Sequence, residues 1–162
     1  MRFSHVIYDS WKGKQNEKFE TLFNKIDLDA LGGLILDLGS GSGFLGEFLK
    51  TSGIDTLNFV ELEIDKDMIR KSYGEKRILG DGNNPPFKDE MFDWVFCIDA
   101  VHMIECNLSC LVKPGGYIII SLFFNQENLQ DKKEIIMRKI GDFEILEEFI
   151  HEGQENELFI FA

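Results

Sequence analysis

The sequence lacks an apolar run long enough to cross a membrane, which takes about 20 residues. Residues 1–8 also carry neither the long apolar stretch nor the small-residue cleavage site of a signal peptide, so we expect a cytoplasmic protein without membrane contact. Basic residues are scarce, with 17 Lys and Arg against 29 Asp and Glu, and the net charge is -12. Phosphate backbones would be repelled, which argues against a nucleic-acid partner unless a local basic patch or a partner subunit supplies the contact.

Cysteine is also scarce, since the chain has only Cys97, Cys106 and Cys110 and no C-x-x-C pair. An odd number at these spacings argues against a disulfide framework and against a metal site. We therefore expect reduced cysteines that pack in the interior, and no bound metal. Repeats and low-complexity segments are missing as well. The length fits a single domain over residues 1–162, of which residues 1–30 form an N-terminal helical segment.

The most informative stretch that is present joins an apolar run to a glycine-rich loop. Residues 34–38 are apolar without alternation, apart from Asp37, as in a strand that is covered on both faces of a parallel sheet. Gly39, Gly41 and Gly43 follow, and glycine allows positive φ angles and a close approach of a ligand to the backbone. Apolar residues then recur at helical spacing, so a helix begins at the loop and points its free N–H groups toward it. The stretch predicts a ligand site.

The glycine loop alone leaves two interpretations open. Residues 41–46 also fit the G-x-G-x-x-G fingerprint of dinucleotide-binding enzymes. An NAD-dependent oxidoreductase is therefore an alternative at this point.

Helices and strands alternate along the rest of the chain. Apolar spacing predicts a helix over residues 14–26, and Tyr8 and Trp11 just before it either pack on that helix or form a lid over the ligand. Later predicted elements are strands over residues 57–63, 76–79, 91–98 and 117–122, a short helix capped by Asp65, a turn over 112–116, a helix marked by Leu129, Ile136 and Ile140, and an antiparallel hairpin over 143–150 and 157–161.

Polar candidates follow two of these strands. Glu63 ends the second strand beside the glycine loop, where a carboxylate can accept both hydroxyls of a ribose, although neighbouring acids make a plain surface position an equal alternative. Asp99 and His102 follow the fourth strand, at the edge where ligands of open α/β sheets bind.

Five segments, in this order along the chain, resemble the class I S-adenosylmethionine-dependent methyltransferases. They are residues 36–43, 61–69, 80–82, 86–93 and 112–121. Asp37, two residues before the first glycine, belongs to that family's first motif, and the nicotinamide fingerprint does not require it. The nicotinamide interpretation also gives no account of Asp81 or of the Lys-Pro-Gly-Gly turn. The resemblance implies a three-layer α/β fold with a mostly parallel seven-stranded sheet and an antiparallel last strand.

The resemblance also implies S-adenosylmethionine as cofactor and a role for each motif residue. The loop residues Gly39, Ser40, Gly41 and Gly43 would touch the methionine part of the cofactor. Asp37 would lie near its ammonium group, and Glu63 would hold the ribose hydroxyls. Asp81 would accept a hydrogen bond from the adenine amino group, with the Gly82 N–H close to the ring. An acidic pocket suits the cationic sulfonium.

Catalysis by such a protein depends mainly on orientation and on the exclusion of water. His102 is a candidate general base with Asp99 as a second, and the alternative for His102 is a packed residue at a strand end. Only nine residues separate Ile104 from Pro114, where the family places a complete helix, so we expect an open substrate side. That side could serve a small molecule, a protein, or a second subunit of a homodimer or partner, and it is also compatible with a non-catalytic cofactor-binding module.

Overall fold

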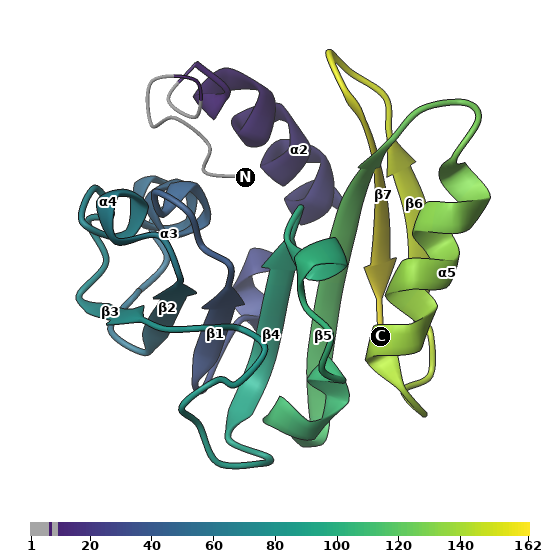
Figure 1. Ribbon diagram of the computed structural model, residues 1–162. Coiled ribbons are helices and arrows are strands. Elements are labelled where there is room, and N and C mark those ends of the chain that lie inside the picture. Colours follow the sequence, from purple (N-terminus) through teal and green to yellow (C-terminus); the bar gives the residue numbers. More distant parts are fainter. Residues whose placement is uncertain (1–6, 8–9) are drawn as a thin grey trace.

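A seven-stranded sheet forms the middle of the computed structural model, which describes residue 7 and residues 10–162 (Figure 1). The strand order is β3-β2-β1-β4-β5-β7-β6. The strands are β1 Ile35–Leu38, β2 Phe59–Glu63, β3 Lys76–Leu79, β4 Phe92–Ile98, β5 Val112–Phe124, β6 Glu147–His151 and β7 Asn156–Phe161. Strands β1 to β5 are parallel, and β7 runs antiparallel to both β5 and β6. The predicted sheet and its antiparallel last strand are confirmed.

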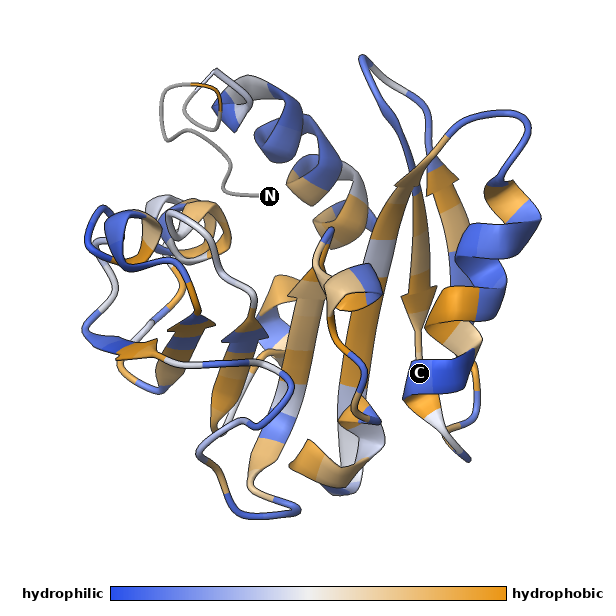
Figure 2. Ribbon diagram, in the orientation of Figure 1, coloured by the Kyte–Doolittle hydropathy of each residue, from blue (hydrophilic) through white to orange (hydrophobic). Residues whose placement is uncertain are grey.

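Helices cover both faces of this sheet. The α-helices are α2 Lys12–Lys25, α3 Phe44–Thr51, α4 Lys66–Ile69 and α5 Leu129–Ile140, and short 3₁₀ helices are η1 Leu28–Ala30, η2 Val101–Met103 and η3 Leu108–Leu111. Helices α2 and α3 pack on one face, while α5, η2 and η3 pack on the other. Apolar strands therefore lie between polar outer helix surfaces (Figure 2), which gives the three predicted layers.

Two apolar cores meet at the sheet, and β4 contributes to both. Its Trp94 and Phe96 belong to the core under α2 and α3, whereas Val95 and Cys97 belong to the core under α5. Successive side chains of a strand point to opposite faces, so burial on both faces requires an unbroken apolar run. This explains why the central strands show no polar alternation in the sequence.

One predicted turn, over residues 112–116, is wrong, because β5 already begins at Val112. Val112 pairs with Phe92, but the next paired residues are Trp94 and Tyr117, so the residues between them bulge from the ladder. Gly115 has a φ of 79° there. Glycine and proline mark a β-bulge as well as a turn, and the sequence signal does not separate the two.

The remaining boundaries differ from expectation by a few residues. Helix α2 begins two residues before the predicted start, and β6 begins at Glu147 rather than at residue 143. Between β4 and β5 the chain forms only η2 and η3, which confirms the expected lack of a full helix at this point.

Candidate functional site

A cavity of about 880 Å³ lies at the carboxyl ends of β1, β2, β4 and β5. It brings together seven of the residues selected from the sequence: Asp37, Gly39, Ser40, Gly41, Glu63, Asp99 and His102. Three others, Gly43, Asp81 and Gly82, do not line it. The cavity therefore unites the glycine loop with residues that are more than 60 positions away in the sequence.

The glycine loop presents bare backbone to this cavity. Gly39 and Gly41 have φ angles of 79° and 57°, a region that side chains other than glycine rarely adopt. The N–H groups of Gly39 and Ser40 donate to the Leu62 carbonyl at 2.8 and 3.1 Å, which fixes the loop to β2. A Cβ on Gly39 would lie 2.5 Å from the Ala100 Cβ, so the loop also packs closely against the end of β4.

Glu63 joins the end of β2 to the glycine loop. Its Oε2 accepts a hydrogen bond from the Gly41 N–H at 2.8 Å, and its Oε1 accepts one from the Asp65 N–H at 2.9 Å. A carboxylate has about four acceptor positions, so both oxygens can still accept from a ligand. Asp65 caps α4 by accepting from the backbone N–H groups of Asp67 and Met68, as the sequence predicted.

Asp37 is buried at the base of the cavity, with 3% of its surface exposed. Burial raises the pKa of the Asp37 carboxyl well above its usual range, and the negative charges of Glu61 and Glu63 raise it further. A cationic group in the cavity would favour the ionised form. The site is thus suited to a ligand with a positive charge.

Asp99 is already engaged by other parts of the chain. Its carboxylate accepts from the Lys18 ammonium at 2.8 Å and from the Phe123 N–H at 2.9 Å, and its backbone has a φ of 55°. Burial alone would raise the pKa of Asp99, but the charge of Lys18 and these hydrogen bonds lower it below its usual range. Asp99 therefore stays ionised as an anchor for Lys18.

His102 lies on η2, is solvent-exposed and lines the cavity. Partial burial of the ring lowers the pKa of His102, Lys132 lowers it further, and the charge of Asp99 acts in the opposite direction. The imidazole is consequently neutral at neutral pH and able to accept a proton.

Helix α2 and the Trp11 that precedes it form a wall of the cavity through Trp11, Gln15 and Phe19, none of which the sequence assigned firmly to the site. Trp11 lines the cavity, which agrees with the lid interpretation, whereas Tyr8 lies outside the described residues. Lys18, on the same helix, was missed altogether, although a lysine next to Phe19 on the apolar face is an unusual signal that could have indicated it.

Buried charges hold α2 in this position. The Lys18 ammonium, whose side chain is 1% exposed, lies 2.8 Å from Asp99, 2.9 Å from Glu157 and 3.5 Å from Glu155. Burial alone would lower the pKa of Lys18, but the charges of Asp99 and Glu157 raise it above its usual range. Burial raises the pKa of the Glu157 carboxyl, which favours its protonated form. Lys18 and Asp99 are thus the two members of the cluster whose pKa shifts both favour the charged form.

The three residues outside the lining make local contacts. Asp81 accepts from the Asn83 N–H at 2.8 Å, and the Gly82 carbonyl accepts from the Cys106 thiol at 3.2 Å. Gly43 precedes α3 with a φ of 79°. Their contact with a cofactor stays a prediction.

Within residues 7 and 10–162, no group of His, Cys, Asp and Glu side chains is arranged to hold a metal ion. The same residues contain no helix that is both long and apolar enough to span a membrane. All three cysteines are free thiols. Cys97 is buried, as predicted, but Cys110 is exposed, so the prediction of interior packing is wrong for that residue.

Comparison with known proteins identifies the family. Residues 36–120, more than half of the chain, match the family model described as a methyltransferase domain. The biotin biosynthesis bifunctional protein BioHC of Cellvibrio japonicus is 26% identical over 125 residues, which are 72% of this chain and 25% of that protein. The chain thus spans about a quarter of the length of this curated relative.

Solved structures show the same fold. PH0226 from Pyrococcus horikoshii OT3 has a TM-score of 0.68 and 21% identity, with 91% of this chain and 89% of that chain covered. An S-adenosylmethionine-dependent methyltransferase from Mesorhizobium loti has a TM-score of 0.64 and 14% identity, with 90% and 96% covered. A chain of the Haloferax volcanii complex between the Trm112 methyltransferase activator and its methyltransferase partner has a TM-score of 0.53 and 22% identity, with 82% and 67% covered. With its family model, sheet order and glycine loop, this protein belongs to the class I S-adenosylmethionine-dependent methyltransferases.

Proposed function

We propose that the chain binds S-adenosylmethionine in the cavity and transfers its methyl group to an acceptor. The observation that carries the proposal is the hydrogen bond of 2.8 Å between Gly41 N–H and the Glu63 carboxylate, with the buried Asp37 beside it. This arrangement offers free carboxylate acceptors for ribose hydroxyls, bare backbone, and an acid for an ammonium group. The residues present therefore fit the cofactor, which supplies an activated methyl group on a cationic sulfur when it is bound.

Each residue then has one binding role. Glu63 holds the ribose, Gly39, Ser40 and Gly41 support the methionine part, and Asp37 pairs with its ammonium group. Asp81, Gly82 and Gly43 keep their predicted contacts as part of the proposal, and for Asp81 and Gly82 these contacts require the segment after β3 to approach the cavity when the cofactor binds.

The cavity wall at α2 and the neutral imidazole of His102 both serve methyl transfer. Trp11 and Phe19 form apolar surface that excludes water from the reacting groups. His102 accepts the proton that a hydroxyl or amine acceptor releases. Asp99, engaged by Lys18, serves mainly to fix α2 over the cavity.

Isothermal titration with S-adenosylmethionine, S-adenosylhomocysteine, NAD and NADH tests the cofactor. We expect micromolar binding of the first two ligands and none of the nicotinamides. Binding of the nicotinamides instead would overturn the proposal in favour of an NAD-dependent oxidoreductase. Binding of none of the four ligands would overturn it in favour of a non-binding scaffold.

Cofactor affinity should rise with pH because of Asp37. The pKa of this buried carboxyl is raised by burial and by Glu61 and Glu63, so the carboxyl holds its proton to a higher pH than an ordinary aspartate, and a bound cation favours release of that proton. Affinity therefore increases with pH below the pKa of the free protein's Asp37 and levels off above it. Calorimetry from about pH 5 to about pH 8, in buffers of different ionisation enthalpy, should reveal the released proton. Asp37→Asn should bind weakly and without this proton release, and an unchanged release in that variant would refute the coupling.

Replacement of His102 by alanine should lower turnover far more than cofactor affinity. A general base contributes about 10²-fold or more to a rate, whereas His102 has no predicted contact with the cofactor. Steady-state kinetics and calorimetry on the same preparation separate the two quantities. If the variant turns over as fast as the native enzyme, His102 is no base.

The proposed acceptor is a small molecule or a protein, and the proposed partner is a second subunit. Met103 and Phe123 are 57% and 43% exposed at the cavity, which leaves apolar surface for an acceptor or a second subunit. One structural neighbour is found with a methyltransferase activator, which supports testing for a partner subunit beside a homodimer. Binding without methylation across a broad acceptor panel would favour a non-catalytic module, whereas slow methylation of any acceptor favours the enzyme. The expected cytoplasmic location stays a prediction.

A further inference from the structure

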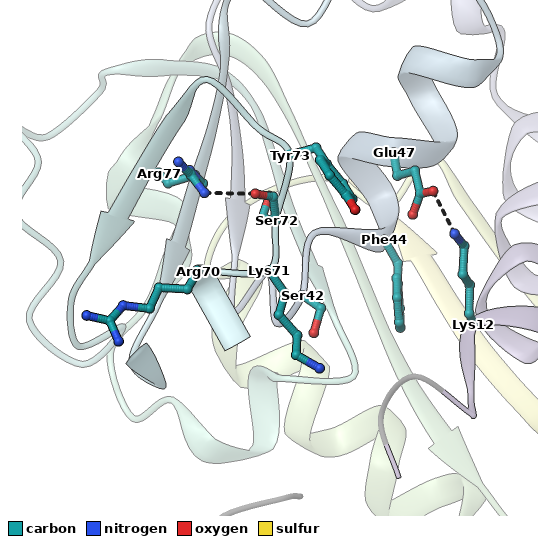
Figure 3. Close-up of a pocket in the computed structure, with 9 residues that line it drawn as sticks. All are labelled: Lys12, Ser42, Phe44, Glu47, Arg70, Lys71, Ser72, Tyr73 and Arg77. Atoms are coloured by element: carbon teal, nitrogen blue, oxygen red, sulfur yellow. Dashed lines mark hydrogen bonds and ion pairs between the residues drawn. The ribbon is translucent and has the colours of Figure 1, made fainter. Parts of the chain in front are cut away.

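A second cavity, of about 800 Å³, lies on the other side of Phe44 and is lined by basic side chains (Figure 3). In the part of the chain that the structure describes, Phe44 is the one residue that lines both cavities. The lining comprises Lys12, Ser42, Phe44, Glu47, Arg70, Lys71, Ser72, Tyr73 and Arg77. We call this set the basic groove. None of the residues assigned to cofactor binding or catalysis lines this groove.

The charge of the basic groove is opposite to that of the whole protein. Four of the 17 basic residues gather here, although the net charge of the chain is -12. Among the described residues, Glu47 is the only acidic one in the groove lining, and the Lys12 ammonium lies 2.6 Å from its carboxylate. A local positive field on an acidic protein attracts anions selectively.

One buried acid, Glu61, contacts the groove lining through Ser72. Glu61 accepts a hydrogen bond from the Ser72 hydroxyl, and burial raises the pKa of Glu61, which opposes its ionised form. The Arg77 charge acts on it in the other direction. Arg77 also donates to the Ser72 carbonyl at 2.8 Å, which uses one of its five N–H donors and leaves the rest of the guanidinium for a ligand.

The Ser42 hydroxyl is a second indication of a ligand, beside the basic side chains. Its hydroxyl oxygen is buried and has no hydrogen-bond partner among the described residues, and Ser42 as a whole is 7% exposed. A buried hydroxyl without a partner is energetically costly, so such groups usually have a role. Figure 3 shows the Ser42 oxygen on the side of the groove toward which the Lys71 side chain extends. Arg70 extends away from them, so it contributes to the field rather than to the contact.

We propose that the basic groove binds a small molecule that carries a phosphate group. Lysine and arginine with hydroxyl donors are the usual ligands of phosphate oxygens. The volume is that of a small-molecule site. The rings of Phe44 and Tyr73, the latter 79% exposed, add flat surface for a planar part of the ligand. The acidity of the remaining surface argues against a nucleic-acid strand.

Backbone amide chemical shifts in a titration with sodium pyrophosphate, uridine 5′-monophosphate and uridine test this proposal. We expect saturable shifts at residues 42–44 and 70–73 with the two phosphates and none with uridine. Lys71→Glu should weaken phosphate binding by about tenfold, while Arg138→Glu should change it by less than about twofold. Arg138 is a matched control because it carries the same charge on the exposed surface of α5, 3.9 Å from Glu134.

Three results would overturn the proposal. They are the absence of saturable shifts, shifts confined to the loop at 39–41 and to Glu63, and equal weakening by the two variants. If Lys71→Glu fails to fold, the native protein still decides, because binding in the groove must weaken several-fold when salt is raised to about 0.2 M. None of the probes is a methyl donor, so this outcome is separate from that of the cofactor titration.

Discussion

Replacement of Lys18 by methionine is expected to lower the free energy of unfolding by about 2–3 kcal/mol, because it leaves the Asp99 carboxylate, whose side chain is 26% exposed, without its charged partner. The Lys18 side chain is 1% exposed, and its ammonium lies 2.8 Å from the Asp99 carboxylate, whose lowered pKa keeps it ionised. Methionine has a similar volume but cannot compensate this charge. Denaturant unfolding should show the loss, and the thermal midpoint should fall by about 10 °C.

Lys25 provides the matched control on the same helix. Its ammonium lies 3.3 Å from Glu147, but the lysine side chain is 50% exposed, so Lys25→Met should cost no more than about 1 kcal/mol. Glu157→Gln should also cost little, because burial already favours the protonated carboxyl. Equal stability of the Lys18 and Lys25 variants would mean that α2 is held by its apolar contacts alone, through residues such as Phe19 and Leu22.

Much of the fold was predictable from the sequence because its signals are local. The apolar run with Asp37, the three glycines and the helical spacing after them lie within a few residues of each other, and β1, the loop and α3 follow this order. Glu63 could be selected because chain order and right-handed crossovers place the end of β2 beside the end of β1. Parallel pairing of Asp37 with Glu61 and of Leu38 with Leu62 confirms this placement.

Other features depend on residues that only the folded chain brings together. The contact of Lys18 with Glu157 joins positions 139 residues apart, and no local sequence pattern predicts it. The basic groove combines Lys12 from α2, Ser42 from the glycine loop, residues 70–73 after α4 and Arg77 from β3. The glycines and proline before Tyr117 permit both a turn and a bulge, and strand pairing decides between them.

Replacement of Glu63 by alanine is expected to raise the Kd for S-adenosylmethionine by about 100-fold, or about 2.7 kcal/mol. Two losses contribute to this effect. The ribose hydroxyls lose a charged acceptor, and each hydrogen bond to a charged group is worth about 1.5–3 kcal/mol. The N–H groups of Gly41 and Asp65 lose the carboxylate that accepts from them at 2.8 and 2.9 Å, so the loop is less firmly placed. Calorimetry with S-adenosylhomocysteine as second ligand should show a similar loss, because both ligands contain the ribose.

The Asp67→Ala variant tests whether cofactor binding depends on the position of the Glu63 carboxylate or only on its negative charge. Asp67 lines the same cavity and carries the same charge, but it lies in the first turn of α4, beyond the strand end that meets the loop. If the cavity merely needs negative charge for a cationic ligand, both variants should weaken S-adenosylmethionine binding equally. Binding of S-adenosylhomocysteine, which lacks the sulfonium charge, should then be less affected. If Glu63 holds the ribose, Asp67→Ala should change either Kd by less than about threefold, a surface-charge effect, while Glu63→Ala loses both ligands alike. Retained binding of both ligands in Glu63→Ala would place the ribose elsewhere in the cavity.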